Sequence, residues 1–260
     1  MGVRPAAVAG LFYPDDSREL RALVSDCLTA PGVAGAPPKA LIVPHAGYEY
    51  SGPVAGRAYG LLKAARGAIT RVVLLGPSHR VAFGGLALSS ASRFSTPLGD
   101  VPVDHEAAAC IRALPQVTVL DRAHAQEHSL EVHLPFLQVV LGDFGLVPLV
   151  VGNASPAEVA EVLELLWGGP ETLIVASSDL SHYHDYATAQ RMDEATSAAI
   201  QALRYEDLGD DDACGRIPVS GLLSVARRRG LQARVVDLRN SGDTAGTRDQ
   251  VVGYGAYAIT

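Results

Sequence analysis

The sequence predicts an α/β fold with a central, largely parallel or mixed sheet flanked by helices. Short apolar runs of the kind found in buried strands alternate along the chain with segments of helical periodicity. Three of these apolar runs lead within a few residues into polar clusters that contain histidine. No linker is long enough to divide the chain, so residues 1–260 are expected to form a single domain.

The expected strands share a short apolar centre, and they are residues 40–44, 71–76, 85–89, 117–120, 147–151, 173–178, 233–238 and 251–259. The expected helices carry apolar residues at helical spacing, and they are 16–29, 53–66, 104–114, a segment ending at 141, 156–167, 185–203 and 219–229. Asp15 or Asp16 is the expected cap of the first helix and Ser155 that of the fifth. Residues 31–38, rich in proline, glycine and alanine, predict a loop.

Composition limits the classes of partner. Hydrophobic residues make up 48% of the chain, which is enough for a sizeable core, and the net charge of −7 opposes binding to nucleic acid or to an anionic membrane. No apolar run approaches the roughly 18 residues of a membrane span, and the N-terminal segment lacks the apolar stretch of a secretory signal. Cys27, Cys110 and Cys214 are odd in number and share no CxxC spacing, which is typical of reduced thiols. We therefore expect a cytoplasmic protein that acts on a small molecule.

Two histidines follow expected strands, His45 after residues 40–44 and His79 after residues 71–76. The carboxyl ends of strands in an open α/β sheet converge on one crevice, so both imidazoles should reach the same site. Either histidine alone could equally be bonded to loop backbone. Two of them at strand ends favour metal ligation, because histidine is the commonest metal ligand and needs rigid placement.

A third polar cluster follows the strand 173–178. Asp179 precedes His182 by three residues, so its carboxylate could orient that imidazole as a general base or support a metal ligand. The structural alternative is a group of capping residues for the helix expected at 185–203. His184 fits that surface role better than a role in the site.

The segment from Gln126 to His133 is dense in ligating groups. On a helix, Glu127 and Glu131 would share a face, whereas His128 and His133 would not, so the pattern misses that of a zinc-peptidase helix by one residue. Glu127 and His128 either reach the site from a loop or first turn, or belong to a helix start with acids near its positive end. Both interpretations stay open.

Two histidines need a carboxylate to form the facial triad of an oxygen-activating iron site. Asp243, in the turn after the strand 233–238, is one candidate, and Glu127 and Asp179 are the others. Asn-Ser-Gly-Asp is also an ordinary turn sequence. The phosphate-binding motif G-x-x-x-x-G-K-[ST], the G-x-G-x-x-G fingerprint and the G-x-S-x-G elbow are absent, so nucleotide binding and α/β-hydrolase chemistry lose their usual support.

Taken together, these segments resemble the Memo-like family, known in bacteria as the B component of the AmmeMemoRadiSam set. The resemblance extends over essentially the whole chain, and the matching motifs are Gly10-Leu-Phe-Tyr-Pro14, Pro44-His-Ala-Gly-Tyr-Glu-Tyr-Ser-Gly52, Leu75-Gly-Pro-Ser-His79, Glu127-His-Ser-Leu-Glu-Val-His-Leu-Pro-Phe136, Ser177-Ser-Asp-Leu-Ser-His182, Asn240-Ser-Gly-Asp243 and the tail that starts at Gly253.

The resemblance implies a fold similar to that of the class III extradiol dioxygenases, which hold Fe(II) through two histidines and a carboxylate. It implies that His45 and His79 are metal ligands and that His182 is the base, with Asp179 beside it. Some relatives supply a cysteine as third ligand just after Asn-Ser-Gly-Asp. Here Thr244 stands at that place, which makes Asp243 the more attractive third ligand.

The function implied by this resemblance is a dioxygenase-like reaction on a small substrate, with an aromatic compound as the narrower expectation. Fe(II) is the expected metal, with Cu and Zn as alternatives, and Glu127, His128 and Asp179 would tune the site around the base. Phe12, Tyr48 and Tyr50 would line the apolar part of the pocket. A metal- or peptide-binding protein with a vestigial site, and a hydrolase with a metal-bound water, stay open as alternatives. The resemblance also suggests a functional link to the other AmmeMemoRadiSam components.

Overall fold

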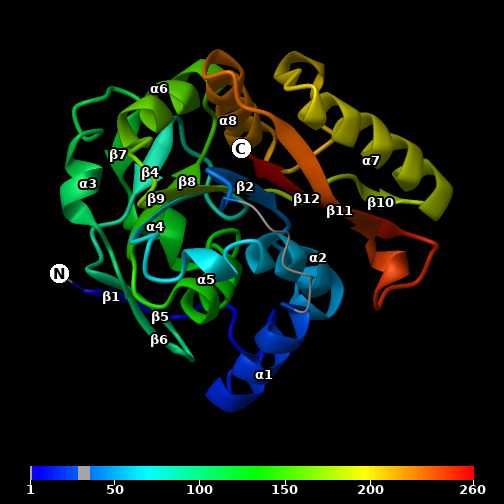
Figure 1. Cartoon of the computed structure of the whole chain (residues 1–260), viewed down its shortest axis with the longest axis horizontal. Coiled ribbons are helices and arrows are strands. Elements are labelled where there is room, and N and C mark those ends of the chain that lie inside the picture. The colour runs from blue at the N-terminus through cyan, green and yellow to red at the C-terminus, as the bar shows by residue number, and fades with distance from the viewer. Residues whose placement is uncertain (1, 29–35) are drawn as a thin grey trace.

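The computed structural model describes residues 2–28 and 36–260. In this part of the chain a nine-stranded mixed sheet runs through the centre, in the order β10-β12-β2-β9-β3-β8-β4-β7, with β11 paired to β12 (Figure 1). Its strands are β2 (Ala40–Val43), β3 (Arg71–Pro77), β4 (Leu86–Leu88), β7 (Val117–Val119), β8 (Gly145–Val151), β9 (Thr172–Ser177), β10 (His182–His184), β11 (Ala233–Asn240) and β12 (Val251–Ile259). A small second sheet joins β1 (Val3–Arg4), β5 (Arg93–Thr96) and β6 (Gly99–Pro102).

Helices cover both faces of the large sheet (Figure 1). They are α1 (Ser17–Cys27), α2 (Tyr48–Gly60), α3 (His105–Ala109), α4 (Asp121–Ala125), α5 (Leu134–Leu141), α6 (Pro156–Leu166), α7 (Tyr186–Gln201) and α8 (Arg216–Arg228). Short 3₁₀ turns lie at η1 (Lys63–Ala65), η2 (Glu131–His133), η3 (Tyr205–Asp207) and η4 (Ser241–Asp243). The expected α/β fold with a mixed sheet and flanking helices is confirmed.

The four central strands β2, β9, β3 and β8 run parallel, and nearly all of their residues are buried. Strands that are covered on both faces read as continuous apolar runs, which is why these runs were so clear in the sequence. β12 is antiparallel to β2, and β4 is antiparallel to β8, so the sheet is mixed at both sides of the parallel centre.

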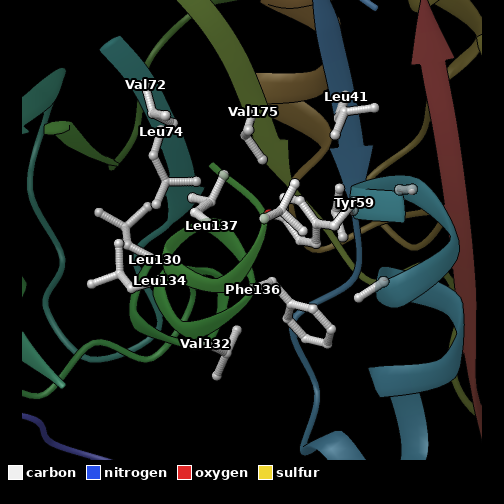
Figure 2. Packing of buried hydrophobic residues seen from close by; sticks show 14 of the residues in the cluster. Leu41, Tyr59, Val72, Leu74, Leu130, Val132, Leu134, Phe136, Leu137 and Val175 are labelled. Carbon is white, nitrogen blue, oxygen red and sulfur yellow. The ribbon is translucent and has the colours of Figure 1, made fainter. Parts of the chain in front are cut away.

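Side chains alternate between two apolar layers, because successive residues of a strand point to opposite faces. Leu41 and Leu74 face one layer, which α1, α2 and α5 cover. Figure 2 shows this layer, with Phe136 and Leu137 of α5 and Tyr59 of α2 packed beneath the strands. The neighbouring residues Ile42, Val73 and Leu75 face the other layer, which α6 and α8 cover.

Several element boundaries follow the capping chemistry. Asp16 caps α1 through hydrogen bonds from the backbone N–H groups of Arg18 and Glu19, and Ser155 forms a capping box with Glu158 at α6. The second helix starts at Tyr48 rather than at residue 53, so Pro53 lies inside it and not in its first turn. Of the loop expected at 31–38, residues 31–35 lie outside the described residues, and so does the end of the first expected helix at residue 29.

The parallel centre brings three polar segments to one edge of the sheet. β2, β3 and β9 end at Val43, Pro77 and Ser177, and each leads into one of the polar clusters identified in the sequence. Among residues 2–28 and 36–260, no helix has both the length and the apolar composition that crossing a bilayer requires.

Two buried histidines make the stability of this fold depend on pH. Burial lowers the pKa of His124 from 6.5 to about 4 and that of His133 to about 3, so both rings are neutral in the folded protein. The unfolded chain binds these protons more tightly, so their contribution is complete above pH 6.5 and is lost as the pH falls through the folded values. We expect the free energy of unfolding to fall by up to roughly 1.4 kcal/mol per pH unit and per histidine below pH 6.5. Burial raises the pKa of Asp179 to about 7 and that of Asp193 to about 6, which acts in the opposite direction over the same range. Urea unfolding between pH 4.5 and 7.5 is therefore compared between the wild type and His124→Gln, and equal pH profiles would contradict the histidine contribution.

Candidate metal centre

His45 lies two residues beyond β2, and its side chain is 2% exposed. Its Nδ1 is 2.6 Å from the Oγ of Ser177, and its backbone N–H donates to Oδ1 of Asp179 at 2.7 Å. Burial moves the pKa of this imidazole well below its ordinary value, so the ring is neutral at physiological pH. Since Nδ1 is engaged by the serine, Nε2 is the nitrogen that is left for a ligand.

His79 lies two residues beyond β3, and the carboxylate of Glu127 contacts both its backbone and its ring. The backbone N–H of His79 donates to Oε2 of Glu127 at 2.6 Å, and Nδ1 lies 2.8 Å from Oε1. Although burial opposes ionisation, hydrogen bonds from His79 and from the Ser129 backbone bring the pKa of Glu127 down to about 2. A carboxylate that accepts from one ring nitrogen fixes the ring and leaves the other nitrogen for a metal.

His128 follows Glu127 directly and stacks on His79, with ring centroids 4.6 Å apart and planes 24° from parallel. Burial lowers its pKa to about 4, so this ring is also neutral at physiological pH. Its buried Nδ1 makes no hydrogen bond among the described residues, although Oε1 of Glu127 lies 3.4 Å from it. Phe12 packs against the same imidazole, with centroids 4.7 Å apart.

These three histidines form one cluster. One ligand atom from each of His45, His79 and His128 lies within 4.8 Å of the other two. Three imidazoles are a donor set that suits Zn, Cu, Fe and Ni. The cluster is therefore the candidate metal centre of this protein.

The centre opens into a cavity of about 800 Å³. Its walls come from the N-terminal segment, the β2–α2 loop, the residues around β10, the loop before α8 and the start of β12. The lining residues with polar or aromatic side chains are Phe12, His45, Tyr50, His79, His128, Asp179, His182, Tyr183, His184, Asp210, Asp211, Cys214, Ser241, Gln250 and Tyr254. This volume is sufficient for a small molecule beside a metal ion.

His182 and Asp179 both line the cavity, but the structure does not pair them as the sequence suggested. Asp179 instead accepts from the backbone N–H of His45, and burial raises the pKa of its carboxyl to about 7. Burial also lowers the pKa of His182, which keeps that ring neutral and able to accept a proton. His184, expected at the surface, lines the cavity as well.

Asp243, expected as the third ligand, does not belong to the cluster of the three histidines. Its Oδ1 accepts from the hydroxyl of Tyr186 at 2.6 Å, and its Oδ2 accepts from the backbone N–H of Asn240 at 3.1 Å. The carboxylate therefore closes the capping box of η4, as the turn sequence alone would favour. Thr244 likewise bonds within this turn, to the carbonyl of Ser241. His128, expected to tune the site, takes the third place in the cluster.

Tyr48 does not reach the cavity either. Its side chain is 3% exposed, and its hydroxyl donates to the carbonyl of Val132 at 2.6 Å. Because α2 starts at Tyr48, successive residues turn by about 100° around the helix axis and point in different directions. Tyr50 lines the cavity together with Phe12, as expected from the sequence.

The cavity residues that were not identified from the sequence include Cys214, Tyr183 and Tyr254, together with the acidic pair Asp210 and Asp211. The Sγ of Cys214 lies 3.3 Å from Nε2 of His45, the nitrogen left for a ligand. Tyr183 has a φ of 61°, a left-handed backbone that is rare for an aromatic residue, and its ring is 70% exposed. In the sequence, Tyr183 is marked as a candidate cavity residue by its position between His182 and His184.

The sequence profile of the Memo-like protein family matches residues 4–258 of this chain. The chain belongs to the Memo-like family. A MEMO1 family protein from Thermotoga petrophila is 38% identical over 275 residues, covering 96% of this chain and 97% of the relative. Similar proteins occur in Sulfolobus acidocaldarius, at 36% identity with 97% of each chain covered, and in Aquifex aeolicus, at 38% identity with 98% of each covered.

Among solved structures, the Memo-like chain is similar to an uncharacterized protein from Escherichia coli K12. The TM-score is 0.51 at 13% sequence identity, and the match covers 83% of this chain and 98% of the other. At this identity the likeness shows a shared fold alone.

Proposed function

We propose that this Memo-like protein is a metal-dependent, dioxygenase-like oxidoreductase that acts on a small aromatic substrate, with Fe(II) held by His45, His79 and His128. The observation that carries the proposal is the convergence of three ligand atoms within 4.8 Å at a cavity of about 800 Å³.

The donor atoms fit a divalent transition metal. Burial keeps the imidazoles of His45 and His128 neutral, which is the protonation state a metal requires. Glu127 supports His79 as carboxylates support metal-bound histidines elsewhere. Fe(II) bound by these nitrogens would supply open positions for substrate and oxygen.

The protein's own residues would orient the substrate and move its proton. His182 is neutral and lines the same cavity, so it can accept a proton from a substrate hydroxyl. Phe12, Tyr50 and Tyr183 offer aromatic surfaces on which a flat ring can pack. Asp179 holds the loop of His45 through the backbone and keeps that ligand at the floor of the cavity.

Metal analysis and oxygen uptake test this proposal. Protein purified without a histidine tag and reconstituted anaerobically with Fe(II) should consume oxygen when catechols are added. His182→Gln should bind the same amount of iron and lower turnover by roughly 10²- to 10⁴-fold, the usual contribution of a general base. Iron-loaded wild type that consumes no oxygen with any catechol, or a His182→Gln variant with unchanged turnover, would contradict the assignment.

A metal-dependent hydrolase is the second candidate, because the third member of the cluster is a histidine and not a carboxylate. Three histidines with an open position are also the ligand set of zinc sites that activate water. Ester hydrolysis that rises in proportion to zinc content, without oxygen uptake, would establish this function instead.

We further propose that the protein works in the cytoplasm on a small molecule, without nucleic acid as a partner. The net charge of −7 and the three free cysteines support this placement. Membership of the Memo-like family supports a functional link to the other AmmeMemoRadiSam components. Co-purification of those components with the tagged chain, from cells that produce both, tests the link.

A further inference from the structure

Behind the candidate ligands lies a buried network centred on the hydroxyl of Ser177, the last residue of β9. Its Oγ lies 2.6 Å from Nδ1 of His45, 2.8 Å from Nε2 of His133 and 2.6 Å from the carbonyl oxygen of Ser129. The hydroxyl of Tyr59 lies 2.9 Å from Nδ1 of His133. All five residues are at most 2% exposed, so water does not compete for these contacts.

Counting hydrogens assigns every donor in this network. A carbonyl oxygen only accepts, so the single hydroxyl hydrogen of Ser177 points to Ser129. The two lone pairs of Oγ then accept from both imidazoles, and His45 carries its hydrogen on Nδ1. His133 carries its hydrogen on Nε2 and accepts from Tyr59. This is the one assignment that gives each of the four short contacts a single hydrogen, and it leaves the Nε2 lone pair of His45 facing the Cys214 thiol and the cavity.

Ser129 ties the other two ligand segments to the same network. Its backbone N–H donates to Oε1 of Glu127 at 3.0 Å, and its hydroxyl donates to the carbonyl of Pro77, two residues before His79, at 2.8 Å. Ser129 is itself the residue after His128 and is fully buried. A Cβ on Gly76 would lie 2.7 Å from the hydroxyl of Ser129, so glycine at this position permits the close approach.

We propose that Ser129 and Ser177 are positioning residues that hold the three histidine-bearing segments together and keep Nε2 of His45 unprotonated toward the cavity. The effect on metal binding rests on the proposed function. The hydrogen bonds themselves do not depend on a metal. Fixing the tautomer matters because Nε2 faces the thiol of Cys214 at 3.3 Å, and a ring with its hydrogen on Nε2 could not bind a metal through that atom. Supporting contacts of this kind contribute roughly 10- to 100-fold to metal affinity.

The first test reads the tautomers directly. In ¹⁵N-histidine-labelled, metal-free full-length protein, long-range ¹H–¹⁵N spectra should show His45 protonated on Nδ1 and His133 on Nε2. His45→Gln and His133→Gln variants assign the two signals. A wild-type His45 that carries its hydrogen on Nε2 would overturn the inference, whatever the metal-binding result.

The second test measures Zn(II) affinity by competition with a chromophoric chelator. Ser177→Ala should bind Zn(II) roughly 10- to 100-fold more weakly and lose the uniform Nδ1–H signal of His45, because that hydrogen has no acceptor left. Ser220→Ala is the matched control, since Ser220 is equally buried and its Oγ has no hydrogen-bond partner among the described residues. Unchanged affinity in Ser177→Ala would overturn the positioning role.

The two proposals fail in different ways. A wild-type protein that shows the expected tautomers but binds no metal refutes the metal function and leaves the hydrogen-bond assignment standing. If Ser177→Ala does not fold, Ser129→Ala replaces it, because this change removes the bond to Pro77 while the carbonyl that accepts from Ser177 remains. Ser129→Ala should then weaken Zn(II) binding while His45 keeps its hydrogen on Nδ1, and a wild-type affinity would overturn the role of Ser129.

Discussion

Replacing His128 by alanine is expected to weaken metal binding by more than the roughly 10- to 100-fold that the loss of a supporting contact costs. His128 supplies one of the three ligand atoms that lie within 4.8 Å of each other, and its Nδ1 has no hydrogen-bond partner among the described residues. Removing the ring leaves two ligands, which cannot close a three-coordinate face around an ion. Competition between the protein and a chelator for Zn(II), and for Fe(II) under anaerobic conditions, measures the effect.

Asp243→Asn is the matched control for His128→Ala. Both carboxylate oxygens of Asp243 are already engaged, by the hydroxyl of Tyr186 and the backbone N–H of Asn240, and an asparagine keeps the shape of this turn. Metal affinity should therefore stay at the wild-type value. The opposite pattern, with full binding in His128→Ala and loss in Asp243→Asn, would restore the facial triad of two histidines and a carboxylate and exclude the three-histidine centre.

His45 and His79 could be predicted from the sequence because their positions depend on strand topology. Apolar runs that are buried on both faces are visible in the sequence, and parallel strands deliver the residues after them to one edge of the sheet. The same reasoning applies to His182, which lines the cavity. These residues needed no information beyond the order and direction of the strands.

The third member of the cluster could not be predicted, since it depends on competition between local and distant partners. The carboxylate of Asp243 is a suitable ligand for iron, but its two oxygens accept hydrogen bonds from the backbone of its own turn and from Tyr186 instead. His128 gains its place because Glu127 bonds to the backbone and ring of His79, a contact across 48 positions in the chain. The spacing of residues in the sequence does not predict such a long-range contact.

Cys214 shows a further limit of sequence reasoning. It stands beside His45 because the next residue, Gly215, donates its backbone N–H to the hydroxyl of Ser178 at the end of β9. A Cβ on Gly215 would lie 2.3 Å from the carbonyl of Ser177, so only glycine allows this approach of the two loops. A single cysteine without a partner motif gives no sign of such an arrangement.

Glu131→Gln is expected to lower the free energy of unfolding by about 3–5 kcal/mol, the usual cost of breaking a buried ion pair on one side. The carboxylate of Glu131 is fully buried and pairs with the guanidinium of Arg4, which is 5% exposed. It also accepts from the hydroxyl of Tyr13 at 2.6 Å and from the backbone N–H groups of Ala7 and Val8. A glutamine leaves the arginine charge buried without a counter-ion, and urea unfolding at neutral pH measures the loss.

Asp207→Asn provides the comparison for Glu131→Gln. Asp207 pairs with Arg204 at 2.7 Å, but both side chains are more than half exposed, so breaking this pair should cost less than about 1 kcal/mol. Equal losses in the two variants would contradict the view that burial makes the Arg4–Glu131 pair sensitive.

The same ion pair connects the N-terminal segment to the candidate metal centre. Arg4 also donates to the carbonyls of Glu127 at 2.7 Å and His124 at 3.0 Å, so it holds the turn that carries His128. In the double variant Arg4→Met/Glu131→Gln no charge is buried and the glutamine oxygen can still accept from Tyr13 and the backbone, so part of the stability lost in Glu131→Gln should return. Metal affinity should nevertheless be lower than in the wild type and in Glu131→Gln, because a methionine cannot donate to the carbonyl of Glu127 as Arg4 does. If metal affinity returned to the wild-type value together with stability, the position of the turn that carries His128 would depend on overall stability and not on the hydrogen bonds from Arg4.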